Sequence, residues 1–315
     1  APLFLKNHSY GEFIFDQSFA RLAQDLNLAY YPKLIGMSPY SPIEGYQFIY
    51  KENSNKQEIT EILLNYIEVF AKKNNILSCN FLYIDKEWEK LLTKYNYHKW
   101  INIRSQWESI GEENFEEFLN RFNSNQRKNI KKERKSINNQ KIKIKIFTEK
   151  NINEDLMNIM HFFYEQHCLR WGVWGSKYLT DDFFKNSLKT KENLIIFSAF
   201  EETSTKPIAM SMCIKNKENL WGRYWGSLKE INYLHFELCY YQPIEWAIKN
   251  KIKYFDPGAG GQHKRRRGFY AKGTNSLHKW FNYNMENLIV QWLNKVNKET
   301  LVSIKDENNS IPFKK

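Results

Sequence analysis

Cysteine is scarce in this chain of 315 residues. Cys79, Cys168, Cys213 and Cys239 stand 89, 45 and 26 positions apart, with no CxxC pair and no histidine at zinc-site spacing. Disulfide scaffolds and structural zinc sites need closely spaced cysteines. We therefore expect neither a disulfide framework nor a bound metal.

Long apolar runs are also missing. No stretch approaches the roughly 20 apolar residues that cross a bilayer. The start, APLFLKNHSYGEF, has neither the basic region nor the unbroken apolar region of a signal peptide. We expect no membrane span and a cytoplasmic location. Because the chain opens at Ala1 inside a predicted strand, we also expect the first domain to lack its opening elements.

Two nucleotide-binding motifs are absent as well. There is no GxxxxGK[ST], and GAGG at 258–261 lacks the GxGxxG spacing, which argues against a nucleoside triphosphatase and a dinucleotide oxidoreductase. Aromatic residues, in contrast, are abundant, with 22 Phe, 19 Tyr and 10 Trp. This composition indicates a folded protein whose length allows two domains.

The net charge of +12 is concentrated in two segments. Residues 115–146 carry ten basic and three acidic side chains, and residues 263–272 carry five basic side chains and no acid. Such clusters favour a polyanionic partner, such as a nucleic acid, a phosphorylated cofactor or an acidic carrier protein. The alternative is a solvated helix face in a chain rich in Lys, Asn and Ile, although this does not explain an arginine triplet.

Strands and helices alternate along the chain, as in an α/β fold. The first half predicts strands at 1–6, 30–37, 77–84 and 100–109 and helices at 15–27, 58–75, 86–95 and from 115 into the basic stretch to 140. The second half predicts helices at 156–172, 181–188, 234–251 and 284–298 and strands at 193–202, 207–215, 219–227 and 253–260. Pro243 should kink or break the helix that contains it. We expect a first domain at 1–112, a basic helical connector at 113–145 and a second, catalytic domain at 146–315.

Three short segments concentrate residues that can do chemistry, at 8–12, 222–241 and 255–269. In the last, a strand leads through glycines to His263 and four cations, an arrangement suited to an anion. In the middle segment, His235 and Glu237 open a helix, where amide groups can hold phosphate and the side chains can move protons. Residues two apart do not share a helix face, so only one of the two should point into a cleft. His235 could equally be a satisfied core residue.

Two further residues of the middle segment, Arg223 and Cys239, lead to opposite expectations about a functional role. Arg223 lies on a predicted inner strand, and a buried cation requires a partner or a ligand. Cys239 is flanked by aromatic and aliphatic residues, which favours burial over a role as nucleophile.

Several strings resemble a known family. APLFLKNHSYGEF, RKNIKKERKSI, GRYWGS, LHFELCYYQPIEWAI and FDPGAGGQHKRRRGF are similar to a bacterial family of GNAT-superfamily acyltransferases, described as peptidoglycan biosynthesis or recognition proteins and related to Fem-type aminoacyl transferases. The resemblance runs from residue 1 to about residue 298. It implies an α/β fold of two tandem GNAT-like domains, with mixed central sheets flanked by helices, and transfer of an acyl group to an amine.

The resemblance and the candidate segments together predict roles for individual residues. The predicted catalytic residues are His235, Glu237 and His263. The predicted substrate-binding residues are Arg223, Tyr224, Tyr240, Tyr241, Gln262, Lys264 and Arg267 in the second half, and His8, Tyr10 and Glu12 in the first. The residues predicted to contact the acyl donor are Ser227, Leu234 and Phe236.

Two departures from the family pattern affect these roles. The family reads FxPGAQGEHKxxRGF, and this chain has Gly260 and Gln262 where Gln and Glu are usual. Gln262 cannot act as a base, so His263 or Glu237 would replace the glutamate if that is the base in relatives. In the first domain, SPYSPIEGY replaces PFTPxTGxR and loses its arginine, which weakens anion binding there.

GNAT chemistry defines what the second domain must supply. The amine must lose a proton before it attacks, and the oxyanion needs a donor. The resemblance makes GRYWG the central strand and LHFELCYY the helix that faces the donor pyrophosphate. The donor signature RxxGxG is absent, which argues against binding of acetyl-CoA in the ordinary mode and favours a carrier-bound donor. We expect no tightly bound cofactor, with acyl-CoA or an acyl-phosphopantetheine carrier as co-substrate.

Three functions remain open from the sequence. The first is an N-acyltransferase that moves an acyl group, fatty in the leading interpretation, from acyl carrier protein or coenzyme A to an amine of a peptide or small molecule, as in the tailoring of ribosomal peptides. The second is Fem-like aminoacyl transfer from tRNA to a peptidoglycan precursor. The third is a non-catalytic protein that binds nucleic acid or a cell-wall polymer.

Overall fold

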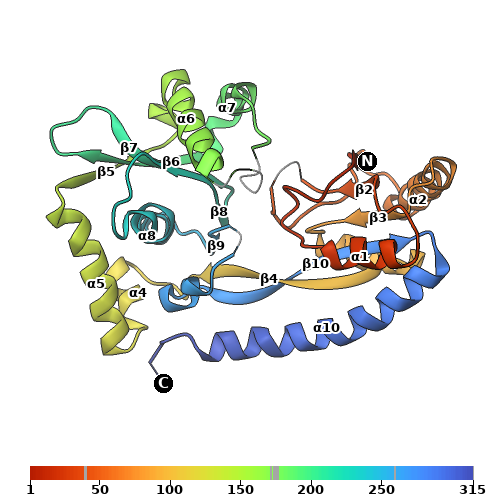
Figure 1. The fold of residues 1–315 in the computed structure, drawn as a ribbon. Coiled ribbons are helices and arrows are strands. Elements are labelled where there is room, and N and C mark those ends of the chain that lie inside the picture. The colour runs from red at the N-terminus through yellow and green to blue at the C-terminus, as the bar shows by residue number, and fades with distance from the viewer. Residues whose placement is uncertain (39–40, 171, 173–176, 259, 315) are drawn as a thin grey trace. The chain divides into compact units, whose positions relative to one another are not determined.

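The computed structural model describes residues 1–38, 41–170, 172, 177–258 and 260–314. Figure 1 shows helices and strands alternating along the chain, as expected. Contacts divide the chain into unit 1, residues 1–103 and 273–305, and unit 2, residues 104–272 and 306–315. The segment 113–145 therefore belongs to unit 2, while 273–305 returns to unit 1. Among the described residues, none of the helices combines the length and apolar character that crossing a membrane requires.

Unit 1 is built on a mixed sheet. Its strands lie in the order β1 (Phe4–Lys6), β2 (Lys33–Gly36), β3 (Ser78–Phe81), β10 (Tyr270–Trp280) and β4 (His98–Glu108), and only the β2–β3 pair is parallel among the pairs whose register is described. Strands β4 and β10 each run on into unit 2. The helices are α1 (Gln17–Asp25), α2 (Lys56–Lys73), α3 (Lys86–Leu92) and most of α10 (Tyr283–Asn309), with the short 3₁₀ turn η1 (Thr93–Tyr95).

Helices cover both faces of this sheet. Neighbouring residues of a strand point to opposite faces, and accordingly Leu34 packs in one buried cluster and Ile35 in another. The Leu34 cluster includes residues of α2 and α3, such as Leu64 and Trp88. The Ile35 cluster includes Phe19 of α1 and further residues of α10. Side-chain caps fix two helix starts, since Asn55 and Asp85 accept backbone N–H groups at the beginnings of α2 and α3.

His278 is fully buried in unit 1 and makes its stability sensitive to acid. Its Nδ1 lies 2.7 Å from Asn80 Oδ1 and its Nε2 lies 2.8 Å from Ser276 Oγ. Burial lowers the pKa of His278 from 6.5 to about 3, so the unfolded chain binds this proton first as the pH falls. The stability that the neutral ring contributes is complete above pH 6.5 and is lost between about pH 6.5 and pH 3.

We therefore expect the free energy of unfolding to fall by about 2 kcal/mol between pH 6.5 and pH 5 through this one group. Urea unfolding of the whole chain at pH 7 and pH 5 measures it. The matched variant His278→Gln should be less stable at pH 7 but should lose about 2 kcal/mol less on acidification. Equal losses in the two proteins would contradict the assignment.

Unit 2 contains the second mixed sheet. Its strands lie in the order β4, β9 (Tyr254–Asp256), β8 (Asn219–Ser227), β7 (Pro207–Lys215), β6 (Leu194–Glu201) and β5 (Ile142–Phe147), and only β8 and β9 are parallel. The helices are α4 (Phe115–Asn120), α5 (Ser124–Asn139), α6 (Glu154–Arg170), α7 (Asp181–Ser187), α8 (Leu234–Phe236) and α9 (Gln242–Lys249). Shorter turns are η2 (Glu149–Asn151), η4 (Leu188–Asn193), the π-helix η5 (Glu237–Tyr241) and the 3₁₀-helix η6 (Gln262–Arg267).

The two faces of this sheet are also covered. Phe197 of β6 packs in a cluster with residues of α4, α5 and α9, whereas its neighbour Ile196 packs with residues of α6 and α7. Strand β8 thus lies between β7 and β9, with helices over both faces (Figure 1).

Two predicted helices are divided in the structure. The helix predicted from 115 to 140 ends at Asn120 and begins again at Ser124, because Asn123 caps α5 by accepting the Gln126 N–H group. The helix predicted at 234–251 changes to π-winding over η5 and returns to α-winding at Gln242, where Pro243 occupies the first turn. Proline has no N–H group to donate and is tolerated in a first turn. The expected break therefore precedes Pro243.

Candidate active site

The site is organised by the separation of β8 and β9. These parallel strands pair only at Asn219–Tyr254, Leu220–Phe255 and Trp221–Asp256. Strand β9 then ends, while β8 continues to Ser227 with β7 as its only strand partner in the described chain. Beyond Trp221, the β9-facing side of β8 therefore has backbone groups without a strand partner.

A β-bulge at Arg223 marks the point of separation. Met212 of β7 pairs with Tyr224, and Cys213 pairs with Gly222, so Arg223 is the extra residue. Bulges redirect side chains and recur beside active sites. The Arg223 side chain is only 3% exposed although the residue as a whole is half-buried, so its exposure lies in the backbone. The main chain of this strand segment is therefore accessible where β8 and β9 separate.

The Arg223 guanidinium is buried, and two of its nitrogen atoms have no hydrogen bond to the described residues. Its Nη2 lies 3.7 Å from Asp256 Oδ1, beyond hydrogen-bond distance, and neither Nε nor Nη2 has a hydrogen-bond partner among the described residues. Nε and Nη2 form one edge of the guanidinium, the geometry that accepts a carboxylate or phosphate side-on. Arg223 is thus a buried cation whose Nε and Nη2 donors are unused, next to the point where β8 and β9 separate.

Lys264 and Asp256 hold the turn that follows β9. Asp256 Oδ1 accepts the Gly258 N–H at 2.8 Å, and Lys264 Nζ donates to the Gly258 carbonyl at 2.7 Å. Gly258 has φ +89°, and a Cβ there would lie 3.3 Å from the Gly222 carbonyl oxygen, so glycine allows the turn to approach β8.

Positive charge exceeds negative charge in this cluster. Asp256 faces Arg223, Lys264 and Arg104, whose Nη1 lies 3.8 Å from Asp256 Oδ2. Burial lowers the pKa of Lys264 to about 8; the Asp256 carboxylate opposes this shift, and the Arg265 and Arg223 guanidiniums add to it. Lys264 therefore carries its charge at pH 7 and loses it as the pH rises through about 8. An oxygen that develops negative charge is favoured beside such a cluster.

His235, Tyr240 and His263 are brought together beside β8. The Tyr240 hydroxyl and His263 Nε2 share a hydrogen bond of 2.9 Å. The His235 ring lies 5.2 Å, centroid to centroid, from both Trp225 of β8 and Tyr240. A chain of side-chain contacts thus leads from Trp225 of β8 through His235 and Tyr240 to His263.

The two histidines differ in accessibility. Burial lowers the pKa of His235 to about 3, so its ring stays neutral. His263 is exposed, and partial burial together with Arg267 and Lys264 lowers its pKa below 6.5. Burial raises the pKa of Tyr240 far above its usual value. At pH 7 the cluster is therefore uncharged, and His263 is the more accessible of its two neutral imidazoles.

Arg267 and Tyr241, predicted to bind substrate, are engaged within the protein. Arg267 donates to both Glu133 oxygens at 2.9 Å and to the His263 carbonyl at 3.0 Å, and its guanidinium lies 3.4 Å from the centre of the Phe236 ring. The Tyr241 hydroxyl also donates to Glu133. These side chains position η6 and the π-helix around the histidines. Sequence reasoning missed Glu133, whose only signal is that it is the single acid between Ser124 and Asn139.

The structure does not bring Glu237 together with the histidines. Its carboxylate is buried, lies 3.0 Å from Arg134 Nη2, and accepts a hydrogen bond of 2.8 Å from Gln242. His235 instead contacts Trp225, so the two residues point apart, as their spacing on a helix predicts. Glu237 faces α5, where its charge is already balanced.

Of the other residues predicted in unit 2, Ser227, Leu234 and Tyr224 contact other parts of the protein. Ser227 Oγ donates to the Lys229 carbonyl at 2.6 Å, and Leu234 lies in the core under α8. The Tyr224 ring packs 5.4 Å from Tyr164 of α6. The Gln262 side chain lies outside the described part of the chain. Cys239 is a half-buried residue with a free thiol, and desolvation of the thiol raises its pKa.

The three residues predicted in the first half lie in unit 1. Glu12 is buried and forms ion pairs of 3.0 Å with Lys6 and 2.8 Å with the fully buried Lys33. His8 Nδ1 accepts the N–H of Tyr10 at 3.2 Å. The Glu12 charge is thus neutralised inside unit 1.

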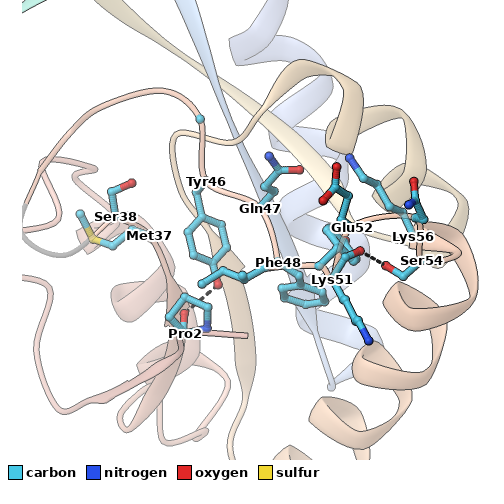
Figure 2. A pocket seen from close by; sticks show the side chains of 14 residues that line it. Pro2, Met37, Ser38, Tyr46, Gln47, Phe48, Lys51, Glu52, Ser54 and Lys56 are labelled. Atoms are coloured by element: carbon cyan, nitrogen blue, oxygen red, sulfur yellow. Dashed lines mark hydrogen bonds between the residues drawn. The ribbon is translucent and has the colours of Figure 1, made fainter. Parts of the chain in front are cut away.

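Unit 1 also contains a groove of about 620 Å³ along the segment that follows SPYSPIEGY. Figure 2 shows Tyr46, Phe48 and Met37 along it, with the Tyr46 hydroxyl donating to the Pro2 carbonyl at 2.7 Å. Lys51 and Lys56 are its only cations among the described lining residues. Positions 39 and 40 of SPYSPIEGY, where the loss of the family's arginine is expected to weaken anion binding, lie outside the described residues.

Comparisons with known proteins identify the fold and the family. No curated protein matches the chain. L-PGS from Bacillus licheniformis is 9% identical, with 73% of this chain and 77% of that chain covered and a TM-score of 0.51. FemX is 11% identical over 92% and 100% of the two chains, with a TM-score of 0.48. A tandem GNAT protein from the clavulanic acid pathway is 8% identical over 79% and 80%, with a TM-score of 0.42.

At these identities the likeness shows the fold alone. The structure confirms the predicted α/β class with mixed central sheets flanked by helices, and L-PGS, with a TM-score of 0.51, shares this fold. The model of the FemAB-like family, described as peptidoglycan biosynthesis/recognition, matches residues 1–315, which confirms the resemblance read from the motifs. The chain belongs to the FemAB-like family.

Proposed function

We propose that unit 2 transfers an acyl group from an activated ester or thioester to a primary amine. The observation that carries the proposal is the hydrogen bond between Tyr240 and the exposed, neutral His263, next to the strand pair that separates at Trp221. Membership of a family related to peptidoglycan synthesis, together with the GNAT-like fold, supports group transfer.

In the proposed reaction, the amine nitrogen attacks the acyl carbonyl and a C–N bond forms. The amine first gives one proton to solvent, since free alkylamines have pKa values of about 10. His263 accepts the second proton, which the nitrogen loses as the C–N bond forms. The C–S or C–O bond to the donor then breaks. Tyr240 gives its proton to the leaving sulfur or oxygen, and His263 returns a proton to Tyr240 through their shared hydrogen bond.

The carbonyl oxygen becomes an oxyanion during this attack. The exposed main chain at the Arg223 bulge can supply an N–H donor, and the Lys264 ammonium supplies positive charge behind it. Arg223, with an unused guanidinium edge, is suited to a carboxylate or phosphate of one of the substrates.

The donor has two candidate forms. Our first proposal is a thioester of coenzyme A or of an acyl carrier protein, with a fatty acyl chain and a peptide or small amine as acceptor, as in peptide tailoring. A second candidate is aminoacyl-tRNA with a peptidoglycan precursor as acceptor, which is favoured by the family match and by the exposed lysines of α5.

The test is transfer by the full chain, followed by mass spectrometry of the acceptor. Palmitoyl-CoA, a palmitoyl carrier protein and a charged tRNA mixture are each offered with a lysine-containing peptide and with a peptidoglycan precursor. A mass increase equal to the acyl group with a thioester supports the first donor, and a ribonuclease-sensitive increase supports the second. No increase with any pair would contradict catalysis and favour a binding protein.

A further inference from the structure

The carboxylate of Glu133 on helix α5 joins two elements of the candidate active site. Both of its oxygens lie 2.9 Å from Arg267 Nη2 in the 3₁₀-helix η6. It also accepts the hydroxyl group of Tyr241 in the π-helix η5. The Glu133 side chain is 15% exposed and the Arg267 side chain 6%, so water competes little for these contacts. One carboxylate thus links η5 to η6.

The same two elements carry the two partners of the proposed proton transfer. Tyr240 precedes Tyr241 in η5, and His263 lies in η6, where its carbonyl accepts a hydrogen bond of 3.0 Å from Arg267. The Tyr240 hydroxyl and His263 Nε2 lie 2.9 Å apart. Hydrogen bonds weaken steeply when they lengthen or lose alignment. The placement of η5 against η6 therefore decides whether a proton can pass between these side chains.

The next residue of α5, Arg134, holds the beginning of the π-helix. Its Nε lies 3.2 Å from both Glu237 oxygens. Glu237 in turn accepts a hydrogen bond of 2.8 Å from Gln242, across the π-helical turn. Such turns are rare and recur at functional sites. Helix α5 thus contacts η5 near both of its ends, through Arg134 at the first residue and Glu133 at the last.

We propose that Glu133 is a positioning residue, which fixes the hydrogen bond between Tyr240 and His263 in the geometry that proton transfer requires. The inference rests on the proposed function, and Glu133 is not itself one of the reacting groups. The alternative is that Glu133 only neutralises the buried Arg267 guanidinium. That role needs a carboxylate beside Arg267, but it does not need the contact with Tyr241.

Three substitutions separate positioning from neutralisation. Glu133→Gln keeps the length of the side chain and removes the charge. Glu133→Asp keeps the charge but is one methylene group too short to hold Tyr241 and Arg267 together. Tyr241→Phe keeps the ring and removes the hydroxyl group. Neutralisation alone predicts near-normal rates for Glu133→Asp and Tyr241→Phe, because both keep a carboxylate at position 133.

Positioning predicts a loss of rate in all three. We expect kcat for acyl transfer to fall about tenfold in the two Glu133 variants and about threefold in Tyr241→Phe, with KM for the donor within about twofold of the wild-type value. The double variant Glu133→Gln/Tyr241→Phe should be no slower than Glu133→Gln, since both changes remove the same contact. The matched control Glu116→Gln removes a carboxylate from an exposed pair with Lys131 of α5 and should keep the wild-type kcat.

A second measurement follows the His263 ring without turnover. The full chain is labelled with ¹³C-histidine, and His263→Ala assigns the ring signal in NMR spectra at pH 7.5. This signal depends on the hydrogen bond to Tyr240 and on the Phe236 ring, whose centre lies 5.6 Å from that of His263. Glu133→Asp and Tyr241→Phe leave the charge unchanged, so a shift of the signal in these variants reports a displaced ring. Glu116→Gln should not shift it.

A His263 signal that stays unmoved in both charge-preserving variants overturns the proposal, whatever their rates. A moved signal with wild-type kcat also overturns it, because the hydrogen bond would then not limit the reaction. Circular dichroism identifies any variant that does not fold, and Tyr241→Phe, which retains the buried ring, decides the question if the Glu133 variants are lost. If no donor supports transfer, the NMR signal still shows whether Glu133 fixes the ring, so failure of the proposed function is recognised separately.

Discussion

His263→Ala should lower kcat for acyl transfer by about 10²- to 10³-fold, the usual contribution of a general base. His263 is exposed, its ring is neutral at pH 7, and its Nε2 is held 2.9 Å from the Tyr240 hydroxyl. Steady-state rates with the donor that supports transfer provide the measurement. Because the side chain is accessible, added imidazole should restore part of the rate.

The pH dependence gives a second readout for the same residue. Partial burial, Arg267 and Lys264 lower the pKa of His263, so the rate should fall only below pH 6.5, as the ring is protonated. This acid limb should disappear in His263→Ala. Tyr240→Phe keeps the aromatic contacts and should cost about tenfold, while His235→Phe should cost less, because the His235 ring stays neutral and packs against Trp225. Retention of kcat within about threefold in His263→Ala would remove His263 from the mechanism.

The outline of unit 2 could be predicted because its signals are local. The alternation of apolar residues defines β8 at 219–227 with the same ends as the structure, and the glycines before His263 mark a turn. The π-helical turn could not be predicted, although Pro243 indicated a break nearby. Strand β5 was not predicted, because its alternating lysines continue the basic composition of the helix before it.

The errors in assigning residues to a site or to a domain arise from pairs of residues that contact each other but lie far apart in the chain. No feature of the sequence near Glu237 indicates that its carboxylate pairs with Arg134, which is 103 positions away in the chain. In the same way, Leu277 of β10 pairs with Phe81 of β3, and this pairing draws residues 273–305 into unit 1. A contiguous second domain at 146–315 was therefore the natural prediction from sequence order. Only the folded chain shows which buried charges already have partners.

Lys264→Met should lower kcat by about 10²-fold, while Lys264→Arg should retain most activity at pH 7. The Lys264 ammonium is buried and donates to the Gly258 carbonyl in the turn after β9, and the proposed step places the oxygen that becomes negative near it. Methionine has a similar length but no charge. Arginine keeps the charge and can still donate to the Gly258 carbonyl.

The alkaline limb of the pH profile separates a catalytic charge from a structural contact. Because the pKa of Lys264 is lowered to about 8, wild-type kcat should decline above about pH 8 as the ammonium loses its proton. Deprotonation of the acceptor amine acts in the opposite direction, since it can only raise the rate as the pH rises. In Lys264→Arg the decline should vanish up to about pH 10, because a guanidinium stays protonated there. A decline that stays near pH 8 in Lys264→Arg would show that another group causes it, and Lys264 would then only support the turn at Gly258.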